Sequence, residues 1–214
     1  TPWIFENLQL TLYKGERIGI VGETGCGKST LLDLLMALLT PTHGELKIDD
    51  QIIDAKLRRS WQAHLAHVPQ AIYLSDSTIS ENIAFGVPKD QIDLSRVMDA
   101  AKKAQIHDTV LTWPQQYETL VGERGVRLSG GQRQRIGIAR ALYKQADVII
   151  FDEATSALDN ETEEALIQTI DKLQQDITII MIAHRLTTLR SCTRIIELVR
   201  DKPHNELTYA QIQS

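Results

Sequence analysis

The segment GETGCGKST, residues 22–30, combines three glycines with a lysine and three hydroxyl side chains. Glycines at this spacing let backbone N–H groups converge on the β- and γ-phosphates of a nucleotide. Lys28 adds a positive charge, and the Ser29 hydroxyl can ligate Mg²⁺. The apolar run RIGIVG before the segment and TLLDLLMALL after it supply the strand–loop–helix context of a phosphate loop. The residues predicted to bind phosphate are Gly22, Glu23, Thr24, Gly25, Cys26, Gly27, Lys28, Ser29 and Thr30.

A pair of carboxylates follows a second apolar run, in VIIFDEATSALD, residues 148–159. A buried strand here delivers Asp152 and Glu153 to its carboxyl end, where α/β proteins bind ligands. One carboxylate can hold Mg²⁺ through water, and the other can accept a proton from an attacking water. His184 and Gln70 also follow predicted strands, so both are candidates for the same edge, although either alone fits an ordinary structural residue.

A second candidate anion site opens the segment LSGGQRQRIGIARAL, residues 128–142. The Ser129, Gly130 and Gly131 turn precedes a clear helix, whose free N–H groups and positive dipole end suit an anion. A helix amino terminus contributes only about 0.3–1 kcal/mol toward an anion at exposed sites, and no lysine or metal ligand accompanies it. A well-capped helix start with Arg133 and Arg135 in solvent is therefore the alternative interpretation.

The elements that must position these residues alternate between strand and helix. Strands are predicted at RIGIVG, GELKIDD, AHLAHV, VIIF, TIIMIA and RIIELV, with a core helix at residues 30–39 that Pro41 stops. In DLSRVMDAAKKA, residues 93–104, the residues Leu94, Val97, Ala101 and Ala104 share one helical face. Another helix is predicted over residues 160–173, capped by Asn160 with Glu163. This pattern predicts an α/β fold, a mostly parallel sheet covered by helices and interrupted by a helical insertion at about residues 69–145.

Composition bounds the partners of this chain of 214 residues. The formal net charge of −5 gives no support to a nucleic-acid partner, so none is expected. Two cysteines do not make a disulfide framework, which indicates a reducing compartment. The longest apolar runs are too short to cross a bilayer.

With the phosphate loop, LSGGQRQR, FDEATSALD and IAHR in this order, the chain resembles the nucleotide-binding domain of ATP-binding cassette (ABC) transporters over Leu8 to Leu198. The resemblance implies a P-loop NTPase core with a small N-terminal antiparallel β portion, ATP and Mg²⁺ as cofactors, and ATP hydrolysis. It implies one domain over 1–214, with 1–68 and 146–214 as the catalytic core and about 69–145 as the helical subdomain. The family's adenine-stacking aromatic is expected before Thr1, with only Trp3 and Phe5 nearby.

The resemblance also implies the role of each site residue. Glu153 would be the general base, Asp152 would hold Mg²⁺ through water, and Ser29 would ligate it directly. His184 would hold the γ-phosphate, and Gln70 would sense Mg²⁺. A second such domain would pair head to tail, so that each ATP lies between one phosphate loop and the partner's signature turn, with Asp159 reaching across the dimer. The signature residues are Ser129, Gly130, Gly131 and Gln132.

Two further segments, TLVGERG (119–125) and TISENIAFG (78–86), are similar to exporters of the family. They imply a membrane domain fused N-terminally and a place on the cytoplasmic face of the cell (inner) membrane. The expected dimer is a homodimer, with pairing to a different cassette as the alternative. The cargo classes implied are lipid, lipid-linked oligosaccharide, polysaccharide or peptide. Three alternatives remain: a soluble ABC-class mechanical ATPase, a non-hydrolysing regulatory module, and another phosphate-loop enzyme such as a kinase.

Overall fold

The computed structural model describes residues 3–125, 127–155, 158–171, 173, 176–182, 185–199 and 204–212. The chain divides into two compact units. The first contains Thr1–Leu65, Ala146–Ile150 and Gln175–Ser214, and the second contains Ala66–Gln145 and Phe151–Gln174. Each predicted phosphate-binding residue of the glycine-rich loop lies in the first unit, whereas the candidate carboxylates and the signature turn lie in the second.

A six-stranded sheet has the order β4-β5-β6-β1-β7-β8. The central strand β1 runs parallel to β6, with Ile18 opposite Ile180, and parallel to β7, with Ile18 opposite Arg194. The edge strand β8 pairs antiparallel with β7. The predicted α/β fold with a mostly parallel sheet is confirmed. The strands are β1 (Arg17–Gly22), β4 (Leu65–Val68), β5 (Val148–Asp152), β6 (Thr178–Ile182), β7 (Arg194–Leu198) and β8 (Asn205–Leu207).

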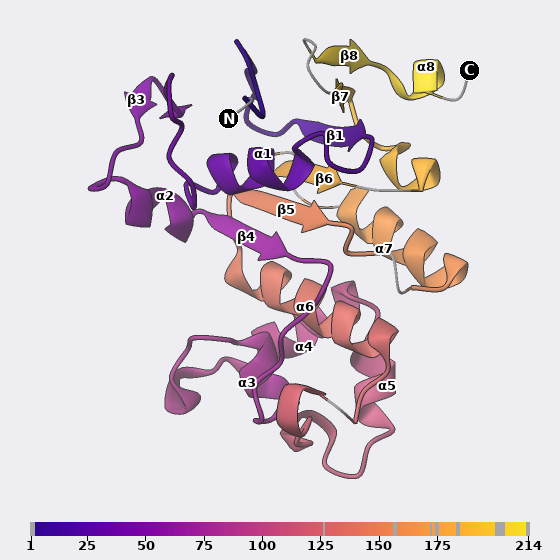
Figure 1. The fold of residues 1–214 in the computed structure, drawn as a ribbon. Helices are drawn as coiled ribbons and strands as arrows, with labels where there is room; N and C mark the ends of the chain where they lie inside the picture. Colours follow the sequence, from indigo (N-terminus) through magenta and orange to yellow (C-terminus); the bar gives the residue numbers. More distant parts are fainter. Residues whose placement is uncertain are drawn as a thin grey trace. The chain divides into compact units, whose positions relative to one another are not determined.

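In the first unit, helix α1 (Lys28–Leu35) follows β1 and packs against it (Figure 1). Its apolar side chains join those of the strands in one buried core, where Ile18, Leu32 and Ile196 are almost fully buried. Helix α2 (Arg58–Ala63) is fixed to α1 by the Trp61 indole, whose Nε1 donates to the Leu35 carbonyl at 2.7 Å. The unit also contains α8 (Tyr209–Ile212), the 3₁₀ turn Leu186–Leu189, and a two-stranded antiparallel sheet of β2 (Lys47–Ile48) and β3 (Gln51–Ile52).

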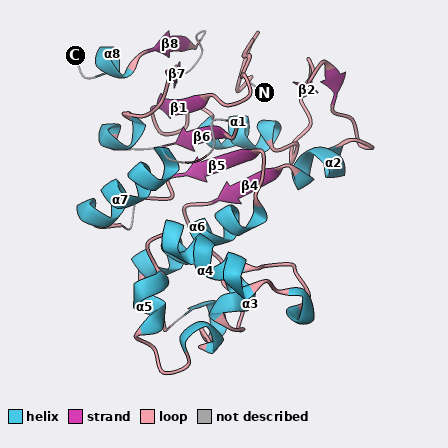
Figure 2. Cartoon of the chain, turned by 180° about the vertical axis from the view of Figure 1, so that it is seen from behind, coloured by secondary structure: helices cyan, strands magenta, loops and turns pink. Residues whose placement is uncertain are grey.

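The second unit is largely helical, as Figure 2 shows. Helix α6 (Gly130–Lys144) contacts both α3 (Ile79–Ile83) and α4 (Leu94–Lys103). Its buried side chains include Ile136 and Ile138, both without exposed surface. The remaining elements are α5 (His107–Leu111), α7 (Asn160–Asp171) and the 3₁₀ turns Lys89–Gln91, Gln116–Glu118 and Glu123–Gly125.

Helix α1 ends four residues earlier than the apolar run predicts, and Pro41 is not what stops it. Ala37 adopts a left-handed conformation, with φ of 53°. The Leu38 N–H donates to the Asp33 carbonyl at 2.8 Å, and the Ala37 N–H donates to the Leu34 carbonyl at 2.9 Å. These paired bonds are a Schellman motif, which satisfies the last carbonyls of the helix and reverses the chain.

Two local predictions in the second unit are also wrong. Leu94 is 48% exposed, whereas Val97, Ala101 and Ala104 are fully buried as expected. Leu94 is the first residue of α4, where the chain has only begun to turn onto the core. The cap of α7 is Asp159 rather than Asn160, because the Asp159 carbonyl accepts the first intrahelical bond, from the Glu163 N–H at 2.9 Å.

Candidate nucleotide-binding site

The glycine-rich loop approaches its neighbours more closely than a side chain would permit. Gly22 has φ of 147°, and a Cβ there would lie 2.5 Å from the Leu198 carbonyl oxygen and 2.7 Å from Cys26 Sγ. Gly27 caps α1 with φ of 103°, a conformation that a residue with a Cβ rarely adopts. The loop is therefore shaped by backbone contacts that only glycine allows at these two positions.

The amino terminus of α1 presents free backbone donors. The first bond within the helix runs from the Leu31 N–H to the Gly27 carbonyl at 2.8 Å, and no side chain caps the helix start. The N–H groups of Lys28, Ser29 and Thr30 therefore precede the first possible intrahelical acceptor. Ser29 is exposed, so its hydroxyl is accessible beside these donors. This arrangement fits the phosphates and the metal that the motif predicts.

The Lys28 side chain folds back over the loop. Its Nζ donates to the Gly22 carbonyl at 2.7 Å and to the Glu23 carbonyl at 3.0 Å. These bonds hold the two ends of the loop together and keep the ammonium at the mouth of the cradle. Because an ammonium has three donors, a phosphate oxygen can be bound by the third or can replace a carbonyl.

Aromatic and thiol groups border the same loop. A Cβ on Gly27 would lie 2.7 Å from the Phe5 ring, so this ring packs directly beside the cradle. Phe5 is the aromatic side chain that the structure places closest to Gly27, whereas Trp3 meets His43 edge to face at 5.4 Å. Cys26 is only 5% exposed and belongs to the hydrophobic core. Its side chain therefore packs in the core, although the residue lies within the predicted phosphate loop.

The structure brings two of the predicted catalytic residues together. Gln70 Nε2 donates to Glu153 Oε2 at 2.7 Å, although the residues are 83 positions apart. Glu153 follows Asp152, the last residue of β5, and has φ of 51°. Left-handed conformations are costly for a residue with a Cβ and concentrate at functional sites. The strained turn aims the Glu153 carboxylate at Gln70, so the predicted base and the predicted metal sensor are in direct contact.

The signature turn is a capping box. Ser129 Oγ accepts from the Gln132 N–H at 3.2 Å, and Gln132 Oε1 accepts from the Ser129 N–H at 2.8 Å. The N–H groups of Gly130 and Gly131 have no such acceptor within the helix. The turn is therefore a well-capped helix start, and it also presents two free N–H donors beside an exposed hydroxyl. The two interpretations of this segment, an anion site and a capped helix start, are compatible.

The two arginines after the turn are not free in solvent. Arg133 NH1 donates to the Leu128 carbonyl at 2.7 Å, which fixes the chain entering the turn. Arg135 NH1 donates to the Gln105 carbonyl at 3.3 Å, which ties α6 to the end of α4. The alternative interpretation, in which both side chains are only solvated, does not hold for these two arginines.

Asp159 is held within its own subunit by Thr162. Its Oδ1 accepts from the Thr162 N–H at 2.9 Å and its Oδ2 accepts from the Thr162 hydroxyl at 2.8 Å. Both bonds lower the pKa of the Asp159 carboxyl, and the bond from the backbone N–H has the larger effect. The charge of Arg135 lowers this pKa further. Thr162 is not among the predicted site residues, although an Asp three residues before a Thr at a helix start is the signal for such a cap.

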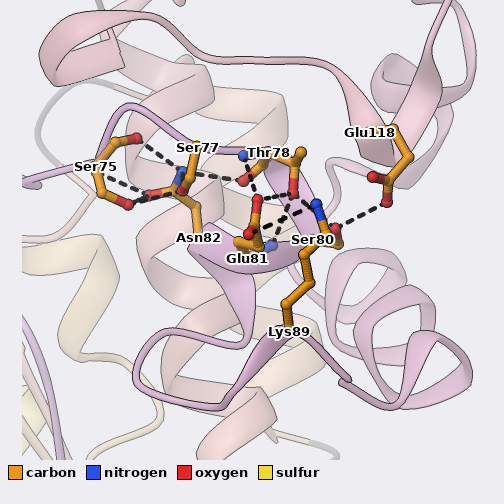
Figure 3. A network of polar contacts seen from close by, with 8 residues as sticks. All are labelled: Ser75, Ser77, Thr78, Ser80, Glu81, Asn82, Lys89 and Glu118. Carbon is orange, nitrogen blue, oxygen red and sulfur yellow. Dashed lines mark hydrogen bonds and ion pairs between the residues drawn. The ribbon is translucent and has the colours of Figure 1, made fainter. Parts of the chain in front are cut away.

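Two segments that resemble exporters lie side by side. The Ile79 N–H donates to the Thr119 carbonyl and the Val121 N–H donates to the Ser77 carbonyl, both at 3.1 Å. Figure 3 shows the polar network beneath this pairing, which includes the bond from Ser80 Oγ to Glu118 Oε1 at 3.2 Å. In these two segments or shortly before them in the sequence, the side chains of Tyr73, Phe85 and Leu120 are 61%, 54% and 49% exposed.

Some predicted residues lie outside the described part of the chain. His184 is one of them, as are Ser156 and Ala157 of the FDEATSALD segment. The role of His184 and its position at the sheet edge stay predictions. In the described residues, no helix is long and apolar enough to cross a membrane.

Comparisons with known proteins agree with this geometry. The family model described as "ABC transporter" matches residues 5–156. An ATP-dependent lipid A-core flippase of Saccharophagus degradans is 43% identical over 189 residues, which are 88% of this chain and 32% of the flippase. The leukotoxin translocation ATP-binding protein LktB of a Pasteurella haemolytica-like species is 45% identical over 212 residues, 96% of this chain and 30% of that protein.

A solved structure gives the same result in three dimensions. A bacterial Atm1-family ABC exporter with ATP bound superposes with a TM-score of 0.91 at 39% sequence identity. The match covers 98% of this chain and 36% of the exporter chain. The chain thus spans about a third of the length of these relatives.

Proposed function

Because the chain belongs to the ABC transporter family, we propose that residues 1–214 form one nucleotide-binding domain that hydrolyses ATP to power an exporter. Within it, residues 1–68 and 146–214 form the catalytic core, and residues 69–145 form the helical subdomain. The observation that carries the proposal is the pair of separate anion cradles, at the starts of α1 and α6. Only the first has a lysine, so the second is suited to a phosphate that another subunit presents.

The residues of the first cradle bind and orient the nucleotide. The α1 donors and Lys28 would hold the β- and γ-phosphates, and Mg²⁺ would be held by Ser29 directly and by Asp152 through water. Mg²⁺ neutralises charge that develops on the phosphate oxygens. The free donors at the start of α1 and the exposed Ser29 hydroxyl fit these groups.

Glu153 is the general base for the attacking water. One of its oxygens accepts from Gln70 Nε2 at 2.7 Å, and this bond orients the carboxylate. The Gln70 side chain also has an amide oxygen, which would be a ligand for Mg²⁺, and the Glu153 carboxylate would take the water proton. His184 holds the γ-phosphate.

The second cradle serves the ATP of a partner subunit in a head-to-tail homodimer. Ser129, Gly130 and Gly131 offer a hydroxyl and two N–H groups, and Gln132 fixes the turn through the capping box. Asp159 contributes from the neighbouring loop to the dimer contact. ADP lacks the shared phosphate, so hydrolysis removes the differential affinity that holds the pair closed.

The partner on the other side is the membrane domain of the transporter, fused N-terminally in the full protein. Its intracellular helices contact the helical subdomain, in which Tyr73, Phe85 and Leu120 are exposed, on the cytoplasmic side of the inner membrane. The relatives named for lipid A-core and leukotoxin translocation favour a lipid or polypeptide cargo over the polysaccharide alternatives.

A soluble mechanical ATPase is the second candidate. The exporter-like segments at 78–86 and 119–125 pair with each other and leave apolar side chains exposed, which favours the transporter. No nucleic-acid partner is proposed.

Steady-state kinetics of Glu153→Gln test the proposal. General-base catalysis contributes about 10²–10⁴-fold, so the hydrolysis rate is expected to fall by this factor, about 3–5 kcal/mol in barrier height. Binding of ATP stays intact in this variant and is lost in Lys28→Ala. Glu161→Gln, an exposed carboxylate on α7, is the matched control and keeps the wild-type rate. Wild-type hydrolysis by Glu153→Gln would refute the assignment of the base.

A further inference from the structure

Arg140, in the third turn of α6, touches three segments of the second unit. Its Nε donates to the Asn82 carbonyl at 2.9 Å, its NH1 to the Tyr73 carbonyl at 3.0 Å, and its NH2 to Asn82 Oδ1 at 3.3 Å. Its guanidinium carbon also lies 4.6 Å from the centre of the Phe85 ring. Burial lowers the pKa of this guanidinium, which still stays charged because its ordinary value is far above neutrality.

The loop after Gln70 is seated on the same helix. A Cβ on Gly137 would lie 2.4 Å from Ile72 Cδ1, so the Ile72 side chain rests on the helix backbone. Leu74 is fully buried, and its Cδ1 lies close to Gly125. The residues on either side of Tyr73 are therefore fixed to α6 and to the turn that precedes it.

Asn82 extends the contact of Arg140 into a polar network that Figure 3 shows. Its side chain is fully buried, with Oδ1 accepting from the Ser75 N–H and Nδ2 donating to the Ser75 carbonyl, both at 3.0 Å. Nδ2 also donates to the Thr78 carbonyl at 3.0 Å. Buried and satisfied polar networks are rigid, so α3 and the 73–77 loop move as one piece.

Arg140 connects two exposed aromatic residues to helix α6, whose amino terminus carries the signature turn. Phe85 and Tyr73 are exposed, yet each is bound to Arg140, Phe85 through its ring and Tyr73 through its carbonyl. Arg140 lies ten residues after Gly130, about 15 Å along a continuous helix. A helix of this length with a buried face transmits a displacement at one end to the other.

We propose that Arg140 is a positioning residue that couples the exposed Phe85 and Tyr73 surface to the amino-terminal turn of α6. A helix of the membrane domain that seats on this surface displaces the Phe85 ring, and the guanidinium carries the displacement into α6. The identity of this occupant rests on the proposed function, whereas the coupling itself does not. Lysine cannot replace arginine here, because one ammonium cannot donate in a planar fork to Asn82 and Tyr73 while stacking on a ring.

Amide NMR of the nucleotide-free chain tests the coupling. The amide resonances of Gly130 and Gly131 are followed in wild type, Phe85→Leu, Arg140→Met and the double variant. Phe85→Leu is expected to shift both resonances in the wild-type background and to leave them unmoved in the Arg140→Met background. Arg140→Lys is expected to retain only part of the shift. A purely structural role would give equal shifts in both backgrounds.

The control is Leu111→Ala, a 42% exposed apolar side chain on α5, which is expected to leave both glycine resonances in place. If Arg140→Met does not fold, the comparison uses Arg140→Lys. Equal Phe85→Leu shifts with and without Arg140, or no shift in the wild type, would overturn the proposal. Because no nucleotide is present, a failure here is distinguishable from a failure of the ATPase assignment, which the Glu153→Gln kinetics report.

Discussion

Gly137→Ala probes the seat of the 70–75 loop on α6 most sharply. An alanine in the middle of a helix ordinarily stabilises it by about 0.8–1.0 kcal/mol relative to glycine. Here the new methyl would lie 2.4 Å from Ile72 Cδ1, 2.9 Å from its Cγ1 and 3.1 Å from its Cγ2. Three contacts this short cannot be relieved by turning one terminal methyl, so the whole Ile72 side chain must move.

The expected size of the effect follows from these opposing contributions. Overpacking costs about 1–3 kcal/mol, which offsets or exceeds the gain in helix propensity. In an Ile72→Ala background the clash is absent, so Gly137→Ala should then stabilise the protein by about 0.8–1.0 kcal/mol. The coupling free energy between the two positions is therefore about 1–3 kcal/mol. When the overpacking cost exceeds the gain in helix propensity, Gly137→Ala destabilises the wild-type chain and stabilises the Ile72→Ala chain.

Thermal unfolding followed by circular dichroism measures the four proteins. For a chain of this length about 1 kcal/mol corresponds to roughly 2–4 °C in Tm. Gly137→Ala is expected to leave Tm unchanged or lower, and to raise it in the Ile72→Ala background. An equal rise in both backgrounds would contradict the packing described here.

Two further predictions concern a cap and a buried phenol. Ser129→Asp keeps an equivalent helix cap and so keeps Tm, whereas Ser129→Ala lowers the free energy of unfolding by about 1 kcal/mol. Only the aspartate adds a charge that repels a partner's phosphate. A lower Tm for Ser129→Asp than for Ser129→Ala would contradict the capping role. Burial raises the pKa of Tyr117 to about 12, so the folded chain keeps this proton while the unfolded chain releases it above pH 10. The free energy of unfolding is therefore expected to fall as pH rises from 10 toward 12. Denaturation of Tyr117→Phe over the same pH range should show a smaller fall.

The parts of the fold that the sequence predicts best are those with strong periodicity. The β-branched runs around Ile18, Ile150 and Ile180 lie in the predicted strands, because a buried parallel strand leaves an uninterrupted apolar pattern. Helix ends were predicted less well. The end of α1 depends on a left-handed Ala37, a residue type that carries no signal for that conformation.

The site shows the same division. The motif residues are recognisable because their chemistry requires particular types at fixed spacing, and the structure brings Gln70 to Glu153 as the strand ends suggest. Arg140 gives no such signal, because its importance comes from Asn82 and Phe85, more than fifty positions earlier in the chain. Long-range side-chain pairing of this kind depends on tertiary packing, which periodicity within one segment does not contain.

Light scattering on Glu153→Gln, with Mg-ATP, with Mg-ADP and without nucleotide, tests the central claim that the two cradles belong to a shared ATP site. A species of twice the 24.1 kDa chain mass is expected with Mg-ATP alone. Ser129→Asp in the same background is expected to abolish it without loss of ATP binding. A protein that binds Mg-ATP and still scatters as a monomer would contradict the account and leave the signature turn as a capped helix start.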